Sequence, residues 1–103
     1  MRRAGGIAMV LLSALCGAPV GAEDADIAYG EYLATQCVTC HRGDVGTGAI
    51  PAIVGLPADY FAHAMRDYRS GARRNEVMRT VSQALGDAEI ASLAAYFGSL
   101  DPP

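Results

Sequence analysis

Two cysteines and a histidine stand together in the segment Cys37-Val38-Thr39-Cys40-His41. Two thiols separated by two residues can add to the vinyl groups of a haem, and a histidine directly after the second thiol is placed to bind the iron. The same residue types also fit half of a zinc site, a redox-active dithiol or a structural disulfide. The rest of the sequence must therefore decide among four kinds of site.

Each alternative to haem attachment needs a further feature. A zinc site calls for a second pair of ligands, but the only other histidine is His63, and the third cysteine, Cys16, lies in a segment that we expect to be removed. A thioredoxin-like dithiol belongs to a βαβ unit, and the sequence has no strand pattern. A disulfide would leave a small domain short of core. We therefore interpret Cys37 and Cys40 as the attachment points of one haem and His41 as its proximal ligand.

A second ligand to such an iron has three candidates after the motif, which are His63, Met65 and Met78. In a helix whose buried face is centred on Phe61, a turn of 100° per residue puts Met65 about 40° from that centre and His63 about 200° from it. Met65 is therefore expected in the core and His63 on the surface. Met78 follows a polar turn and is favoured, because a thioether ligand commonly raises the potential of an electron-transfer haem. An iron with an open position is the alternative.

The first 22 residues have the composition of an export signal. Two arginines precede an apolar run over residues 4–20, and a site suited to signal peptidase ends at Ala22. The run is too short and too rich in glycine to favour a membrane span, although a retained anchor helix or a lipid on Cys16 are alternatives. We predict a signal peptide over 1–22, a mature domain over 23–103, a periplasmic location and no stable membrane insertion after cleavage.

Size and charge narrow the function further. The predicted mature domain has 81 residues, which is marginal for a purely apolar core and favours a cofactor at its centre. The chain has 8 basic residues, all arginine, against 11 acidic ones, and loss of the two signal arginines leaves 6 against 11. This acidic balance argues against nucleic acid as a partner. Five arginines between Arg66 and Arg79 could meet a protein partner, neutralise haem propionates or lie solvated.

The apolar periodicity predicts an all-α domain of about four short helices. The first helix leads directly into the cysteine motif, and a loop rich in glycine and proline follows over 42–57. The second helix begins at Pro57 and stops at Gly71, the third covers 76–85, and the fourth has Asp87 as its N-cap. The side chains predicted to face the core are, helix by helix, Ala25, Tyr29, Tyr32 and Leu33; Phe61, Met65 and Tyr68; Val77, Val81 and Leu85; and Ile90, Leu93, Ala94 and Phe97.

With these features in hand, the sequence resembles the class I c-type cytochromes over nearly the whole predicted mature chain. The matching segments are Gly30-Glu31-Tyr32-Leu33, the cysteine motif, Ile50 to Gly55, Tyr68 to Gly71, Val77-Met78, Leu85-Gly86-Asp87 and Leu93 to Phe97. The resemblance implies a small fold of about four helices around one haem c, with thioether links at Cys37 and Cys40. It also implies His41 and Met78 as iron ligands and a hydrogen bond from His41 to the carbonyl of Pro51.

The same resemblance implies how the first and last helices meet. They are expected to cross at Gly30, with Tyr32 packing near Leu93 and Tyr96, because a glycine inside a helix costs about 1 kcal/mol relative to alanine and indicates a close contact. At the start of the last helix, Gly86 stands where members of the family often have serine, which would leave the capping role to Asp87 alone.

Within the family, the segments 30–41 and 94–100 are most similar to the cytochrome subunit of flavocytochrome c sulfide dehydrogenase. This similarity implies single-electron transfer in a subunit that is not itself an enzyme, with electrons accepted from a flavoprotein. A freely diffusing carrier to a terminal oxidase or reductase is the alternative. A haem enzyme or sensor with an open iron position is a third function, and Met78 separates it from the other two.

Overall fold

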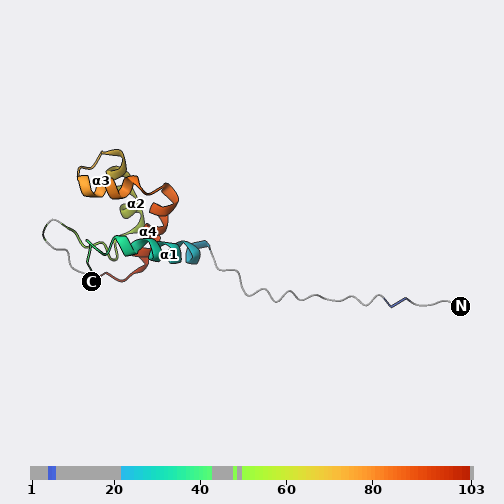
Figure 1. The fold of residues 1–103 in the computed structure, drawn as a ribbon. Coiled ribbons are helices and arrows are strands. Elements are labelled where there is room, and N and C mark those ends of the chain that lie inside the picture. The colour runs from blue at the N-terminus through green and yellow to red at the C-terminus, as the bar shows by residue number, and fades with distance from the viewer. Residues whose placement is uncertain (1–4, 7–21, 43–47, 49, 103) are drawn as a thin grey trace.

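The computed structural model describes residues 5–6, 22–42, 48 and 50–102. These residues form four α-helices, a 3-10 turn and no strand, so the predicted all-α fold is confirmed (Figure 1). The elements are α1 (Ala22–Leu33), the 3-10 turn η1 (Ala34–Gln36), α2 (Ala58–Ser70), α3 (Glu76–Gln83) and α4 (Asp87–Ser99). None of the described helices has the length and apolarity of a membrane span. The predicted signal over 1–22 lies almost entirely outside the described residues.

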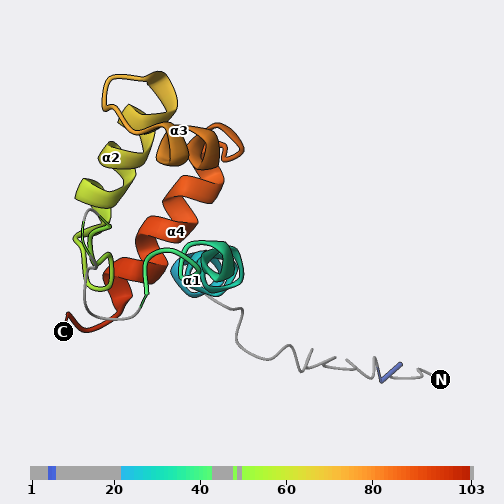
Figure 2. The same ribbon diagram turned by 60° about the vertical axis from the view of Figure 1, so that its left-hand side comes forward.

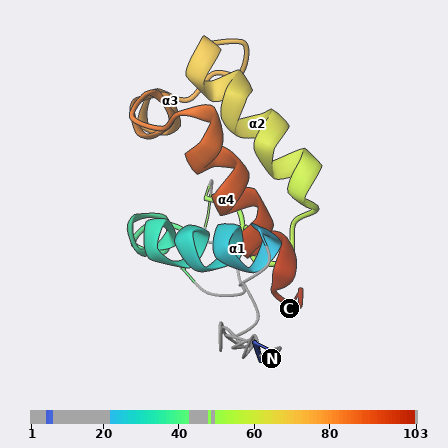
Figure 3. The ribbon, with the colours of Figure 1, turned by 90° about the vertical axis from the view of Figure 1, so that its right-hand side faces the viewer.

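The helices α1 and α4 cross at close range, and Gly30 makes this crossing possible (Figure 3). A Cβ atom at position 30 would lie 2.7 Å from the Cβ of Tyr96 and closer still to the backbone oxygen of Ser92. Glycine is a poor helix former, so helix propensity does not explain its place in α1. The need for a close approach between two backbones does explain it, and the crossing that the resemblance implied is present.

The face of α1 that meets α4 differs from the predicted one. Gly30 is buried and Leu33 packs against the core, but Tyr29 is 46% exposed and Tyr32 is 73% exposed. The two tyrosine rings stack on each other, with centroids 6.4 Å apart. The prediction that they face the core was wrong, because the glycine that permits the crossing decides which face turns inward. The side chain of Ala25 lies outside the described part of the structure.

The core is built around α4. Figure 2 shows α2 beside it and α1, seen nearly end-on, against its lower half, while α3 packs against α2. The rings of Phe61 and Phe97 stack with centroids 5.4 Å apart and join α2 to α4. The core residues predicted for the last helix and for the centre of α2 are confirmed. The buried apolar residues are Ala34, Ile53, Phe61, Met65, Leu85, Ile90, Leu93, Ala94 and Phe97.

The helix ends agree with the predictions in α2 and differ slightly in α3. Pro57 is the N-cap of α2, and Gly71 ends it in the left-handed region at φ 86°. A glycine adopts this conformation without the strain that a Cβ would cause. The third helix ends at Gln83, two residues earlier than predicted. Leu85 is nevertheless buried, whereas Val77 is 64% exposed and does not face the core as predicted.

Asp87 has a role other than the predicted N-cap. It is the first residue of α4, Gly86 occupies the cap position, and the cap makes no side-chain hydrogen bond. The Asp87 carboxylate accepts a 2.6 Å hydrogen bond from Arg69, and Arg66 lies 3.7 Å away. The hydrogen bond and charge of Arg69 hold the pKa of Asp87 below its ordinary value. Arg69 also donates to the carbonyl of Leu85, so it ties α2 to the turn before α4.

We predict that Gly30→Ala lowers the free energy of unfolding by about 2 kcal/mol, because the new methyl group must push two backbones apart. Gly98→Ala is the matched control, since its Cβ would lie no closer than 3.4 Å to Ala58 and Leu56 and would improve helix propensity. Denaturant unfolding of the haem-loaded variants measures both. Equal stability of the two variants would contradict the role assigned to the crossing.

Candidate functional site

The cysteine motif forms a helical turn that continues α1 and η1. The backbone N–H groups of Cys37 and Val38 donate to the carbonyl of Ala34 at 2.9 and 3.1 Å, and the N–H of His41 donates to the carbonyl of Cys37 at 2.9 Å. Both motif cysteines are free thiols, Cys37 half-buried and Cys40 exposed. The motif is therefore held in place by the same helix that crosses α4 at Gly30.

The imidazole of His41 is oriented by the backbone of the following loop. Its Nδ1 atom lies 2.8 Å from the carbonyl oxygen of Pro51. A carbonyl oxygen can only accept, so Nδ1 carries the hydrogen and donates it, and Nε2 keeps a free lone pair. Hydrogen bonds of this kind fix the ring orientation of metal-binding histidines and increase their basicity. The bond that the resemblance implied is present, and it leaves Nε2 available to a metal.

The loop that carries Pro51 is itself fastened to α4. The N–H of Gly55 donates to the carbonyl of Phe97 at 3.0 Å, and Ile53 is buried in the core. Gly55 has φ 79°, and a Cβ there would lie 2.7 to 2.8 Å from Pro102. Only glycine fits both the backbone conformation and the space. The carbonyl that orients His41 is thus fixed by contacts to the C-terminal helix and the residues that follow it.

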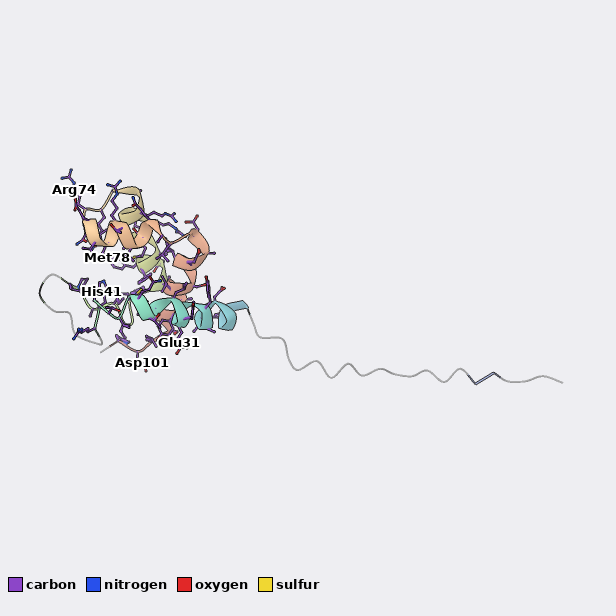
Figure 4. All side chains as sticks on the ribbon, viewed as in Figure 1. Glu31, His41, Arg74, Met78 and Asp101 are labelled. Carbon is purple, nitrogen blue, oxygen red and sulfur yellow. The ribbon has the colours of Figure 1, made fainter. Side chains whose placement is uncertain are left out.

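The three candidates for a second iron ligand lie in different surroundings. Met65 is 5% exposed in the core, and the His63 side chain is 80% exposed beside Asp67, as predicted for both. Met78 is half-buried in the first turn of α3 and packs against the same core cluster as Cys37. Figure 4 shows Met78 on α3 and His41 on the segment below it, at the same end of the domain.

The chemistry of this donor set fits a haem c. Burial raises the pKa of the Cys37 thiol. A redox-active dithiol needs a cysteine with a lowered pKa, so this shift argues against that alternative. The two thiols, the free Nε2 of His41 and the thioether of Met78 are the groups that thioether attachment and iron ligation require. In the described parts of the chain, no three His, Cys, Asp or Glu side chains gather as a metal site, so the zinc alternative finds no second ligand pair there.

The family model for cytochrome c matches residues 27–101. The chain belongs to the cytochrome c family. Over 96 residues it is 36% identical to the thiosulfate dehydrogenase electron acceptor of Thiomonas intermedia (strain K12), a match that covers 90% of this chain and 44% of that protein. Over 80 residues it is 36% identical to cytochrome c-554(548) of Halomonas halodenitrificans, covering 72% of this chain and 95% of that protein.

A further relative is the thiosulfate dehydrogenase electron acceptor of Stutzerimonas stutzeri (strain A1501), which is 32% identical over 101 residues, 95% of this chain and 47% of that protein. This cytochrome thus spans about half the length of the two electron acceptors it matches. Family membership establishes one covalently bound haem c with its iron, and electron transfer through that haem.

Sequence reasoning missed one residue next to Met78. Asn75 is the N-cap of α3, and its side-chain oxygen accepts a 3.0 Å hydrogen bond from the backbone N–H of Met78. The sequence contains a signal for this role, since asparagine is among the preferred N-cap residues and stands three positions before Met78. The prediction from the sequence noted only that Met78 follows a polar turn, of which Asn75 is the last residue.

We predict that a Cys37→Ala, Cys40→Ala double variant carries no haem that survives denaturation, because neither thioether can form. Each single variant retains one link and stays positive when a denaturing gel is stained for haem. Cys16→Ala is the matched control and leaves the staining of the protein unchanged. Haem bound covalently to the double variant would contradict the assignment of the attachment points.

Proposed function

We propose that this cytochrome passes single electrons between periplasmic proteins through a haem held by His41 and Met78. The observation that carries the proposal is the hydrogen bond from His41 Nδ1 to Pro51, which orients the ring and leaves Nε2 free. When bound, the haem supplies a one-electron redox couple at its iron. A histidine and a methionine that both stay in place leave little to rearrange on electron transfer and no open position for a substrate.

Two observations support Met78 as the distal ligand. Its side chain is half-buried and packs against the core cluster, as that of Cys37 does, whereas Met65 is enclosed within that cluster. The exposed side chain of His63 lies on α2 beside Asp67, so it is poorly suited to a haem attached at the motif. The alternative with an open iron position would make the protein a haem enzyme or sensor, and it requires that Met78 stay away from the iron.

The location is proposed from the sequence. Residues 1–22 fit an export signal with cleavage after Ala22, which would leave 23–103 as a cytochrome domain in the periplasm. Haem attachment through two cysteines also fits an exported protein. We propose no stable membrane insertion of the mature protein.

A sulfur-compound dehydrogenase is the proposed electron donor. Two relatives are named as electron acceptors of thiosulfate dehydrogenase, and the segments 30–41 and 94–100 are similar to the cytochrome subunit of a flavoprotein sulfide dehydrogenase. Both names describe a cytochrome that receives electrons from an oxidoreductase of a sulfur compound. A flavoprotein subunit is therefore one candidate partner, and free diffusion to a terminal oxidase or reductase is the alternative.

The arginines offer a surface for such a partner. Arg66 and Arg69 interact with Asp87, whereas Arg73, Arg74 and Arg79 form no ion pair among the described residues. These three line a shallow hollow of about 390 Å³ together with Gly71, Asn75 and Glu76. Figure 4 places Arg74 near Met78 at one end of the domain and Glu31 and Asp101 toward the other. The three arginines would attract an acidic partner to the Met78 end of the domain.

We predict that the oxidised protein is low-spin and has a sulfur-to-iron absorption band that disappears in Met78→Ala. Met65→Ala retains the band but loses about 2–5 kcal/mol of unfolding free energy, because Met65 fills the core. Visible absorption spectra and denaturant unfolding separate the two effects. If the band survives in Met78→Ala and is lost in Met65→Ala, the proposed ligand is wrong.

For the partner, we predict that the native protein co-elutes with a dehydrogenase at low salt and that Arg74→Glu weakens this association. The arginine surface acts through charge, and such attractions are screened as ionic strength rises. Ala91→Glu is the control, since it adds a negative charge at an exposed position of α4 outside this surface. A protein that elutes alone from its native periplasm at every salt concentration would favour the freely diffusing carrier.

A further inference from the structure

The N-terminus of α3 depends on Asn75 for the hydrogen bonds of its first turn. The backbone carbonyl of Asn75 accepts from the N–H of Arg79 at 2.8 Å, and its side-chain oxygen accepts from the N–H of Met78 at 3.0 Å. The first N–H groups of a helix have no partner within the helix, so the Asn75 side chain satisfies the N–H of Met78 from outside it. One residue thus closes the turn that carries Met78.

This cap matters more in α3 than it would in a longer helix. The helix has only eight residues, a length at which a helix is marginal without outside support. In its first turn, Val77 is 64% exposed and Arg79 is exposed, so Met78 is the residue that contacts the core. A methionine side chain has three rotatable bonds and adapts to its surroundings, so it does not by itself fix its own backbone.

We propose that Asn75 is a positioning residue for Met78, holding the first turn of α3 so that the thioether stays on the iron. The inference rests on the proposed ligation by Met78. When the side-chain cap is lost, the first turn opens more often, and a larger fraction of the protein has an iron position that an added ligand can take. Asn75 thus sets the apparent affinity of the iron for an added ligand that replaces Met78, without itself contacting the iron.

The expected size follows from the energetics of N-caps. Replacing asparagine by alanine at an N-cap costs about 1 kcal/mol, which corresponds to about a fivefold change in an equilibrium constant. If opening of the first turn precedes the release of Met78, the apparent affinity of the iron for an added ligand rises by the same factor.

Imidazole binding to the oxidised holoprotein, followed by the visible spectrum, is the test. Asn75→Ala is expected to bind imidazole about fivefold more tightly than the natural protein while keeping its sulfur-to-iron band in the absence of imidazole. Asn75→Ser restores an oxygen acceptor at the cap and returns the affinity to within about twofold of the natural value. Thr80→Ala is the matched control, because it removes an exposed hydrogen bond on the same helix, from Thr80 to the carbonyl of Glu76, but leaves the cap intact.

Unchanged imidazole affinity in Asn75→Ala, or an equal gain in Thr80→Ala, would overturn the inference. If Asn75→Ala does not accumulate with haem, Asn75→Gln replaces it, since glutamine keeps the amide but not the short reach of a capping side chain; natural affinity in that variant also overturns the inference. Met78→Ala is titrated in parallel. If Met78→Ala has the same imidazole affinity and the same absorption spectrum as the natural protein, the proposed ligation fails. If Met78→Ala differs from the natural protein but Asn75→Ala does not, the ligation stands and only the role of Asn75 is removed.

Discussion

Gly30 allows the backbone of α1 to lie directly on α4, and two separate parts of the haem site depend on that contact. The C-terminal end of α1 runs on into the helical turn that carries Cys37 and His41. The C-terminal part of α4 holds the loop that contains Pro51, through the hydrogen bond between Gly55 and Phe97. The histidine and the carbonyl that orients it thus come from segments fixed to the two helices of one crossing. A shift in the crossing would move both partners of the hydrogen bond.

The segment that carries Met78, the proposed distal ligand, is built differently. The helix α3 packs on α2, and Arg69 ties the end of α2 to Leu85 and Asp87 after α3. Met78 stands at the other end of this short helix, where Asn75 supplies the cap. The segment that carries His41 is therefore held by backbone contact at the helix crossing, while the helix that carries Met78 is held by its packing on α2 and by polar contacts at both of its ends.

Much of this arrangement follows from local patterns in the sequence. The spacing of the motif indicated haem attachment, and helical periodicity placed Phe61 and Met65 in the core and His63 outside it. Those inferences need only the chemistry of a few adjacent residues or the phase of one helix. The Pro51 hydrogen bond spans ten positions and came from the family resemblance, because no local pattern specifies it.

The errors have a common origin in contacts between distant segments. Tyr29 and Tyr32 form a plausible apolar stripe on α1, but the crossing with α4 selects the face of Gly30 instead. Asp87 is a good N-cap by residue type, yet its carboxylate accepts a hydrogen bond from Arg69, eighteen positions earlier in the chain. Local sequence preferences were overridden in both places by a partner that the periodicity of a single helix does not reveal.

The central claim is that His41 and Met78 hold the iron from opposite faces of one haem c. A crystal structure of the haem-loaded protein measures this most directly, because it shows which atoms contact the iron. The account predicts iron bonded to Nε2 of His41 and to the sulfur of Met78, with the hydrogen bond from Nδ1 of His41 to Pro51 retained. An iron with no ligand opposite His41, or with Met65 or His63 in that place, would contradict it.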